Sequence, residues 1–169
     1  MSNHRIATIA CSFVLLGGIT LLAAPTREEQ DAIKYADTLK SSTNTKERVT
    51  ALKELARLGR INVGLTKPAV PEIIKALEDK DPKVRAEAAH TIGAVDPVDK
   101  AVVVGKLVKM LKEEKDEAVR EGVAMGLGAM GSSAKDGLGA LRDAAKNAGK
   151  KDAKTYQAAI MSITGKTKN

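Results

Sequence analysis

The sequence predicts an all-α protein: an α–α superhelix, or solenoid, of about three helical hairpins with flanking helices. Apolar residues after Thr26 recur at helical spacing, and no run alternates clearly enough between polar and apolar residues to be a strand. Two-helix segments also recur every 34 to 37 residues. That period is typical of solenoids, in which each hairpin buries its apolar faces by stacking on its neighbours.

The repeat is clearest in two segments of 13 residues that are displaced by 35 residues along the chain. Their sequences are DPKVRAEAAHTIG at 81–93 and DEAVREGVAMGLG at 116–128. Each is predicted to begin a helix. Asp81 followed by Pro82 favours a helix start, because aspartate accepts hydrogen bonds from free backbone amides and proline fits the first turn. Asp116 starts the equivalent helix.

The same pattern predicts the remaining helices. Second helices of the hairpins are expected at 70–77, 104–111 and 138–145, and single flanking helices at 26–40 and 153–164. An earlier first helix is expected to start with a capping box formed by Asn44 and Glu47. Glycine inside a helix costs about 1 kcal/mol relative to alanine. The third repeat, with Gly122 and Gly126, is therefore expected to be soft unless tight helix contacts offset that cost.

Residues 1–24 have the pattern of a signal peptide. Arg5 provides a positive start, residues 6–22 are largely apolar, and the small residues of LLAA at 21–24 provide a cleavage region. This pattern predicts an exported protein, periplasmic or extracellular, whose repeat domain spans residues 25–169.

Two alternatives to a cut after Ala24 stay open. Pro25 would be a poor first residue of a mature chain, so cleavage after Ala23 is one alternative. The other is no cleavage, because an apolar run of 17 residues is long enough to remain as a membrane anchor.

The chain after this segment carries little reactive chemistry. It has no cysteine, its one histidine is His90, and its net charge falls from +7 to +6. Stability must therefore come from aliphatic packing, and a catalytic or metal-bound His90 would lack partners with a recognised spacing. We expect no catalytic residue, no metal site and no cofactor.

The two central segments resemble HEAT repeats, and among these the short HEAT-like type first associated with phycobilisome lyases. The resemblance covers roughly residues 44–164. It implies right-handed superhelical stacking, with the first helix of each pair on the convex side and the second on the concave side. It also implies a structural ladder of paired charges formed by Asp81, Arg85, Asp116 and Arg120.

A solenoid of this kind predicts a non-enzymatic scaffold that binds a protein partner on its stacked helices. The residues expected to contact the partner lie on the predicted second helices: Lys75, Lys106, Lys109, Lys112, Arg142 and Lys146. We expect no specific nucleic-acid target, because related DNA glycosylases use clustered aromatic residues and only Tyr35 and Tyr156 remain after the signal segment.

Two other functions remain as alternatives. One is a lyase-like protein or an accessory subunit of an enzyme. The other is polyanion binding at the C-terminal end, where six lysines from Lys146 onward stand against Asp152 alone. Contact with a membrane is expected only through an uncleaved N-terminal segment or this basic end.

Overall fold

The computed structural model describes residues 24–95 and 97–165 of the chain, so nearly all of the predicted signal segment lies outside them. The described residues form helices and contain no strand. Their elements are α1 (Arg27–Ser41), α2 (Thr45–Ile61), α3 (Val63–Thr66), η1 (Lys67–Ala69), α4 (Val70–Ala76), α5 (Pro82–Ile92), α6 (Lys100–Glu113), α7 (Glu117–Ala129), η2 (Gly131–Gly137), α8 (Leu138–Asn147) and α9 (Lys150–Thr164). The all-α prediction is confirmed.

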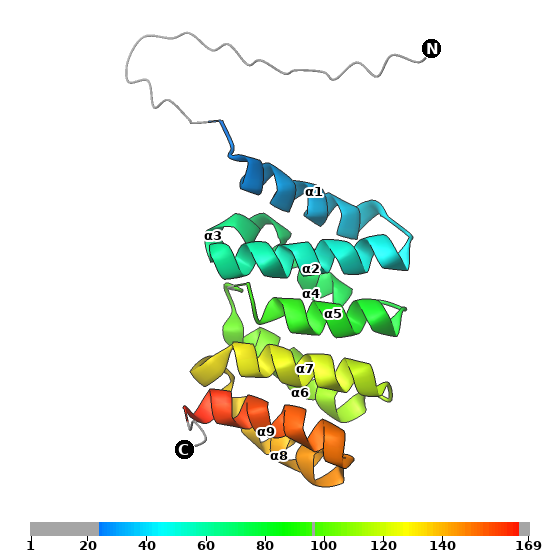
Figure 1. Cartoon of the computed structure of the whole chain (residues 1–169), viewed down its shortest axis with the longest axis vertical. Helices are drawn as coiled ribbons and strands as arrows, with labels where there is room; N and C mark the ends of the chain where they lie inside the picture. The colour runs from blue at the N-terminus through cyan, green and yellow to red at the C-terminus, as the bar shows by residue number, and fades with distance from the viewer. Residues whose placement is uncertain (1–23, 96, 166–169) are drawn as a thin grey trace.

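The helices stack in two layers along one axis (Figure 1). Helices α2, α5, α7 and α9 pack side by side in chain order and form the first layer, while α4, α6 and α8 lie behind them as the second layer. Helix α1 packs on α2 at the N-terminal end of the stack. This arrangement is the solenoid that the 34- to 37-residue period predicts.

The helices pair differently from the expected pattern. The helix at 81–93 was expected to form a hairpin with the helix that follows it, but it pairs with the helix that precedes it. Extensive contacts pair α1 with α2, α4 with α5, α6 with α7, and α8 with α9. Short loops join these pairs, whereas the longer segments α3–η1, 93–99 and η2 join one pair to the next. The expected flanking helices thus belong to hairpins, because a short loop forces consecutive helices to pack against each other.

The helix starts follow from capping residues. Asp81 accepts a hydrogen bond from the Lys83 amide at 2.9 Å, and Asp116 accepts one from the Val119 amide at 3.2 Å, which confirms both predicted starts. Asn44 caps α2, but Glu47 binds the Ser42 hydroxyl at 2.7 Å, so the expected reciprocal capping box does not form there. A complete box occurs at the start of α1, between Thr26 and Glu29.

Close backbone approach holds the first layer together. A Cβ atom on Gly122 would lie 2.4 Å from the Ala86 carbonyl oxygen, and one on Gly126 would lie 2.0 Å from the Ala89 carbonyl oxygen. Only glycine lets α5 and α7 approach this closely. These glycines therefore make the tight contacts that offset their cost within a helix.

An aliphatic core runs the length of the stack between the layers. The large side chains that are fully buried in it include Leu52, Leu55, Ile73, Leu77, Ile92, Leu107, Leu127 and Leu141. Tyr156, which is 2% exposed, closes this core at α9. A continuous core of this kind requires that each hairpin be covered by its neighbours.

Candidate functional site

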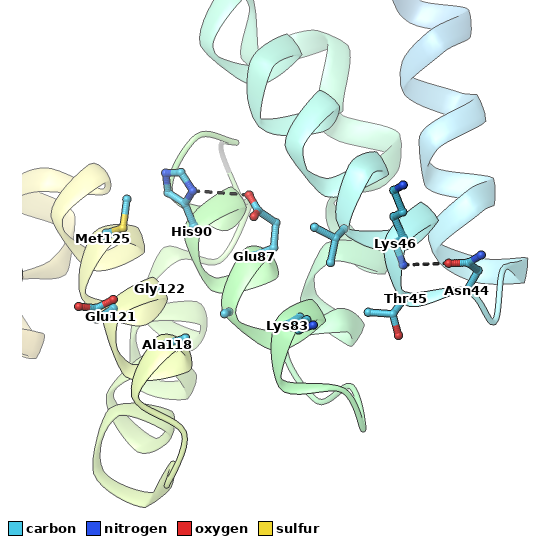
Figure 2. Close-up of a pocket in the computed structure, with 12 residues that line it drawn as sticks. Asn44, Thr45, Lys46, Lys83, Glu87, His90, Ala118, Glu121, Gly122 and Met125 are labelled. Carbon is cyan, nitrogen blue, oxygen red and sulfur yellow. Dashed lines mark hydrogen bonds and ion pairs between the residues drawn. The ribbon is translucent and has the colours of Figure 1, made fainter.

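A groove of about 880 Å³ crosses the outer surface of α2, α5 and α7 (Figure 2). Small or flexible apolar residues line its floor: Val49, Ala86, Ala118, Gly122 and Met125. Polar and charged residues surround the floor: Lys46, Lys83, Glu87, His90 and Glu121. Short side chains form much of the floor of the groove. The residues that let α5 and α7 approach closely carry little or no side chain.

Two further hollows continue the groove in both directions. One of about 490 Å³ lies over α7 and α9 and shares His90 and Met125 with the first. The other, of about 330 Å³, lies over α1 and α2 and shares Lys46. We call this combined surface the trough; its residues include Tyr35, Thr38, Lys46, Val49, Lys83, Ala86, Glu87, His90, Ala118, Glu121, Met125, Lys154, Ala158 and Ser162.

The charges of the trough are unevenly neutralised. The Glu87 carboxylate lies 3.6 Å from Nδ1 of His90 and 3.9 Å from Nζ of Lys53. Lys46 and Lys83 lie on the same surface, and the charge of Lys83 contributes to the lowered pKa of the Asp81 carboxyl. The groove thus presents two cations from neighbouring helices, Lys46 on α2 and Lys83 on α5, while Glu87 lies on α5 and Glu121 on the α7 side (Figure 2).

His90 is a partly exposed residue on the rim of the trough. Its side chain is 34% exposed, and the ring contacts the carboxylate one helical turn earlier. Within residues 24–95 and 97–165 no group of three or more histidine, cysteine, aspartate or glutamate side chains is placed to hold a metal ion.

The structure places the six expected contact residues on the second layer. Lys75 lies on α4, Lys106, Lys109 and Lys112 lie on α6, and Arg142 and Lys146 lie on α8. The second layer therefore carries all six, on the opposite side of the core from the trough.

Most of these cations are paired with acids next to them. Lys75 lies 2.7 Å from Glu72, Lys109 lies 4.0 Å from Glu113, and Lys146 lies 3.5 Å from Asp143. Lys106 forms an ion pair with Glu78, and this interaction lowers the pKa of the Glu78 carboxyl. The lysine-rich face is therefore a mixed surface of compensated charge.

In the charge ladder, an arginine on one first-layer helix forms an ion pair with an acid in the loop that precedes the next first-layer helix. Nε of Arg85 lies 2.8 Å from the Glu114 carboxylate, and Nη1 of Arg85 donates to the carbonyl oxygens of Asp79 and Lys80. Arg48 forms the equivalent ion pair with Asp79. Because Asp79 and Glu114 are 35 residues apart, the repeat itself contains the signal for them, although sequence reasoning had not singled them out.

The two aspartates of the expected ladder are helix caps. Besides capping α5, Asp81 accepts a hydrogen bond from the Thr45 hydroxyl at 2.6 Å. This bond and the Lys83 amide lower the pKa of Asp81. Arg120 repeats the loop contacts of Arg85, because its Nη1 donates to the carbonyl oxygens of Glu114 and Lys115.

Residues 34–104 match the family model of HEAT repeats. This chain is a HEAT-repeat protein. The match ends within α6, and the structure continues the same stacking through α7, α8 and α9. The model describes HEAT repeats in general and does not distinguish the lyase-associated type. A search of curated proteins finds no match to the chain.

HEAT repeats commonly mediate contacts between proteins, and solenoids of this kind offer extended surfaces for them. Among the helices of residues 24–95 and 97–165, none combines the length and the apolar character that a membrane-spanning segment needs.

Proposed function

We propose that this HEAT-repeat protein is an exported, non-enzymatic scaffold that binds a segment of a protein partner in the trough. The observation that carries the proposal is the trough itself, an open surface with an apolar floor and charged surroundings that extends from α1 to α9. Protein interfaces have this composition, with an apolar centre and a polar rim.

The dimensions of the trough suit an extended polypeptide. Packed helices are about 8–10 Å apart, so the four steps from α1 through α2, α5, α7 and α9 span roughly 32–40 Å. A β-like chain advances about 3.3 Å per residue, and about 10–12 residues would cover that distance. The stacked helices hold the surface in place, which lowers the ordering cost of binding.

Met125 is the best candidate for an anchor within the trough. Its side chain is 46% exposed although it is large and apolar, and it lies where two of the hollows meet. Methionine is flexible and polarisable, so it adapts to different partner side chains. The six residues of the second layer are weaker candidates, because ion pairs already engage most of their charges.

Export is supported by the sequence alone. Residues 1–24 have the signal pattern, and the rest of the chain lacks cysteine, so oxidising conditions outside the cytoplasm would not alter it. Fractionation of the producing cells tests this part of the proposal. Recovery of the protein in the cytoplasm would contradict it.

Partner binding can be tested with matched substitutions. Ala118 on α7 is exposed in the trough, and Ala101 on α6 is an exposed alanine of the second layer. A photo-crosslinking residue at Met125 in the producing cells would first identify the partner. Ala118→Glu should then weaken partner binding at least tenfold, equivalent to about 1.4 kcal/mol, whereas Ala101→Glu should leave the affinity unchanged.

Circular dichroism of both variants would show that the fold is retained. Equal affinities of the two variants would reject the trough. A loss with Ala101→Glu alone would instead locate the partner on the second layer.

A further inference from the structure

We propose that the partner segment bound in the trough carries opposite charges at two positions, an acidic side chain over α2 and a basic side chain over α7, with apolar side chains between them. The inference rests on the proposed function and names the chemistry of the segment. It follows from the way charge is distributed over the three helices that form the groove.

The two outer helices of the groove contribute opposite charges to it. Among the residues that line the groove, α2 supplies the cation of Lys46 and α7 supplies the anion of Glu121. Figure 2 shows these two residues on opposite sides of α5. Lys46 is exposed and Glu121 is half-buried, so a bound segment can reach both charges.

The α2 side is cationic beyond Lys46. The side chain of Lys53 is 63% exposed, and its Nζ lies 3.9 Å from the Glu87 carboxylate of α5. Glu47 lines the separate hollow toward α1, where it accepts a hydrogen bond from the Ser42 hydroxyl. Ion pairs engage two arginines of this helix, Arg48 with Asp79 and Arg57 with Glu54. Lysines are therefore the charges that α2 presents beside the groove.

The α7 side is anionic beyond Glu121. Glu117 and Asp152 share a hydrogen bond between the first turns of α7 and α9, and the charge of Glu121 is among the causes that raise the pKa of Glu117. The guanidinium of Arg120 donates to carbonyl oxygens of the loop before α7, so it is held at that loop. Lys154 of α9 lines the next hollow along the trough.

Helix α5 contributes compensated charges to the centre of the groove. Glu87 has Lys53 on one side and Nδ1 of His90, at 3.6 Å, on the other. Lys83 interacts with the Asp81 carboxyl and helps to lower its pKa. A segment that crosses α5 therefore meets the apolar floor and charges that already have partners.

The spacing of the helices sets the spacing of the charges on the segment. Two steps between packed helices span roughly 16–20 Å, and alternate residues of an extended segment are about 6.6 Å apart. Three such intervals cover the distance from α2 to α7. An acid and a base about six residues apart would thus lie over Lys46 and Glu121, while the alternate residues between them face Val49, Ala86 and Gly122 on the floor.

The arrangement selects a partner more than it strengthens binding. Charges at the rim of an interface stay in contact with water and add little affinity, whereas a like charge placed opposite them is unfavourable. Segments with two acids or two bases at these positions should therefore be rejected.

Selection from a library tests this chemistry. Random segments of about 12 residues, displayed on phage, are selected against the full chain. The bound segments should be enriched in an acid and a base about six residues apart, with apolar residues between them. Enrichment of segments without such a pair, or no enrichment, would overturn the proposal.

Charge reversal then tests which residues pair. A selected segment is synthesised with a fluorescent label, and its affinity is measured by anisotropy. Lys46→Glu and Glu121→Lys should each weaken binding roughly tenfold or more. Reversing the acid of the segment should restore binding to the Lys46→Glu protein, and reversing its base should restore binding to the Glu121→Lys protein. A lack of rescue would overturn the proposal, because direct pairing makes one reversal compensate for the other.

Matched reversals outside the trough are the controls. Glu113 and Lys115 line a separate hollow beside α6, so Glu113→Lys and Lys115→Glu should leave the affinity unchanged. Equal losses in these controls would show that net charge alone acts, and would overturn the pairing. If circular dichroism shows that Glu121→Lys does not fold, Glu121→Gln replaces it. Neutralising the base of the segment should then cause no further loss.

Ala118→Glu separates this proposal from the proposed function. If it abolishes binding of the segment while the charge reversals have no effect, the trough binds a partner and the charge preference is wrong. If it leaves binding unchanged, the segment binds elsewhere on the protein, and the trough itself is rejected.

Discussion

Gly126 shows how strongly a single position constrains this fold. Its hypothetical Cβ atom would stand 2.0 Å from the Ala89 carbonyl oxygen, far closer than two such atoms can approach. Gly105 on α6 is the contrasting case, because nothing lies within 4 Å of a Cβ atom there. Both residues lie within helices, so the cost of glycine in a helix is the same for both.

We predict opposite effects of alanine at these two glycines. Gly126→Ala should destabilise the protein by about 2 kcal/mol or more, because α5 and α7 must separate to admit the methyl group. Gly105→Ala should stabilise it by roughly 0.5–1 kcal/mol. Urea unfolding followed by circular dichroism gives both values. Similar effects of the two substitutions would show that α5 and α7 are not in close contact.

The Arg85–Glu114 pair is the residue contact that most directly links two units. The two side chains are 20% and 15% exposed, so water screens the pair only in part. The hydrogen bond from Arg85 holds the pKa of Glu114 below its ordinary value. Since the folded state favours the ionised carboxylate, the pair stabilises the fold above the ordinary carboxyl pKa.

We predict that this contribution disappears in acid. Wild type should exceed Glu114→Gln in free energy of unfolding by about 1 kcal/mol at pH 7, because a charged acceptor binds more strongly than a neutral one. The difference should shrink as the pH falls below about 4.3 and through the lowered pKa of the folded state. Urea unfolding of both proteins from pH 7 to pH 3 measures it. A difference independent of pH would contradict the role of the Glu114 charge.

At the scale of elements, the first turns of α7 and α9 show how the stack changes at its C-terminal end. At the position of Asp79 and Glu114 the next loop has Gly149, so the ladder of acids ends there. Glu117 and Asp152 instead face each other from the two first turns, and their hydrogen bond raises the pKa of Glu117. Tyr156 lies nearby, and its burial raises the pKa of the phenol.

For the Glu117–Asp152 pair we predict a pH dependence of stability opposite to that of Glu114. Because the folded-state pKa of Glu117 is raised, its contribution is most favourable in acid and declines as the pH rises through that pKa. Glu117→Gln should therefore raise the melting temperature at pH 7 and lose this advantage near pH 4. Melting curves at both pH values provide the test, with Glu113→Gln on the neighbouring α6 as a control. A gain that persists in acid would exclude repulsion between the carboxylates.

At the scale of the whole molecule, stability is distributed along one axis. Helices α5 and α7 have a first-layer neighbour on each side, whereas α1 ends the stack with a helix on one side only. In such arrays the stability of each unit depends on the units next to it. The centre of the stack is therefore the most stable region.

Amide hydrogen exchange should reproduce this order. We expect the strongest protection in α5 and α7 and weaker protection in α1 and α9, because local opening at an end breaks one interface instead of two. Exchange followed by NMR or mass spectrometry would resolve the four helices. Equal protection throughout would mean that the stack unfolds as one cooperative unit.

The sequence predicted the fold more fully than it predicted the site. The repeat of aspartate, arginine and glycine located α5 and α7, and Asp81 and Asp116 cap them as expected. The capping box expected at Asn44 formed instead at Thr26, because Glu47 binds Ser42. The sequence did not predict the trough. The lysines predicted as contact residues lie in the second layer, whereas the small residues that line the trough lie in the first.

The sequence by itself determined where the helices start, that they repeat and that they must stack. Helical spacing, capping and the burial of an apolar face depend on neighbours along the chain or on the repeat period. The repeat places Asp79 and Glu114 at equivalent positions, but only the tertiary structure decided that arginines bind them and which face is hollowed. Those features depend on how closely helices about 35 residues apart approach, and the lack of a side chain at Gly122 and Gly126 sets that distance for α5 and α7.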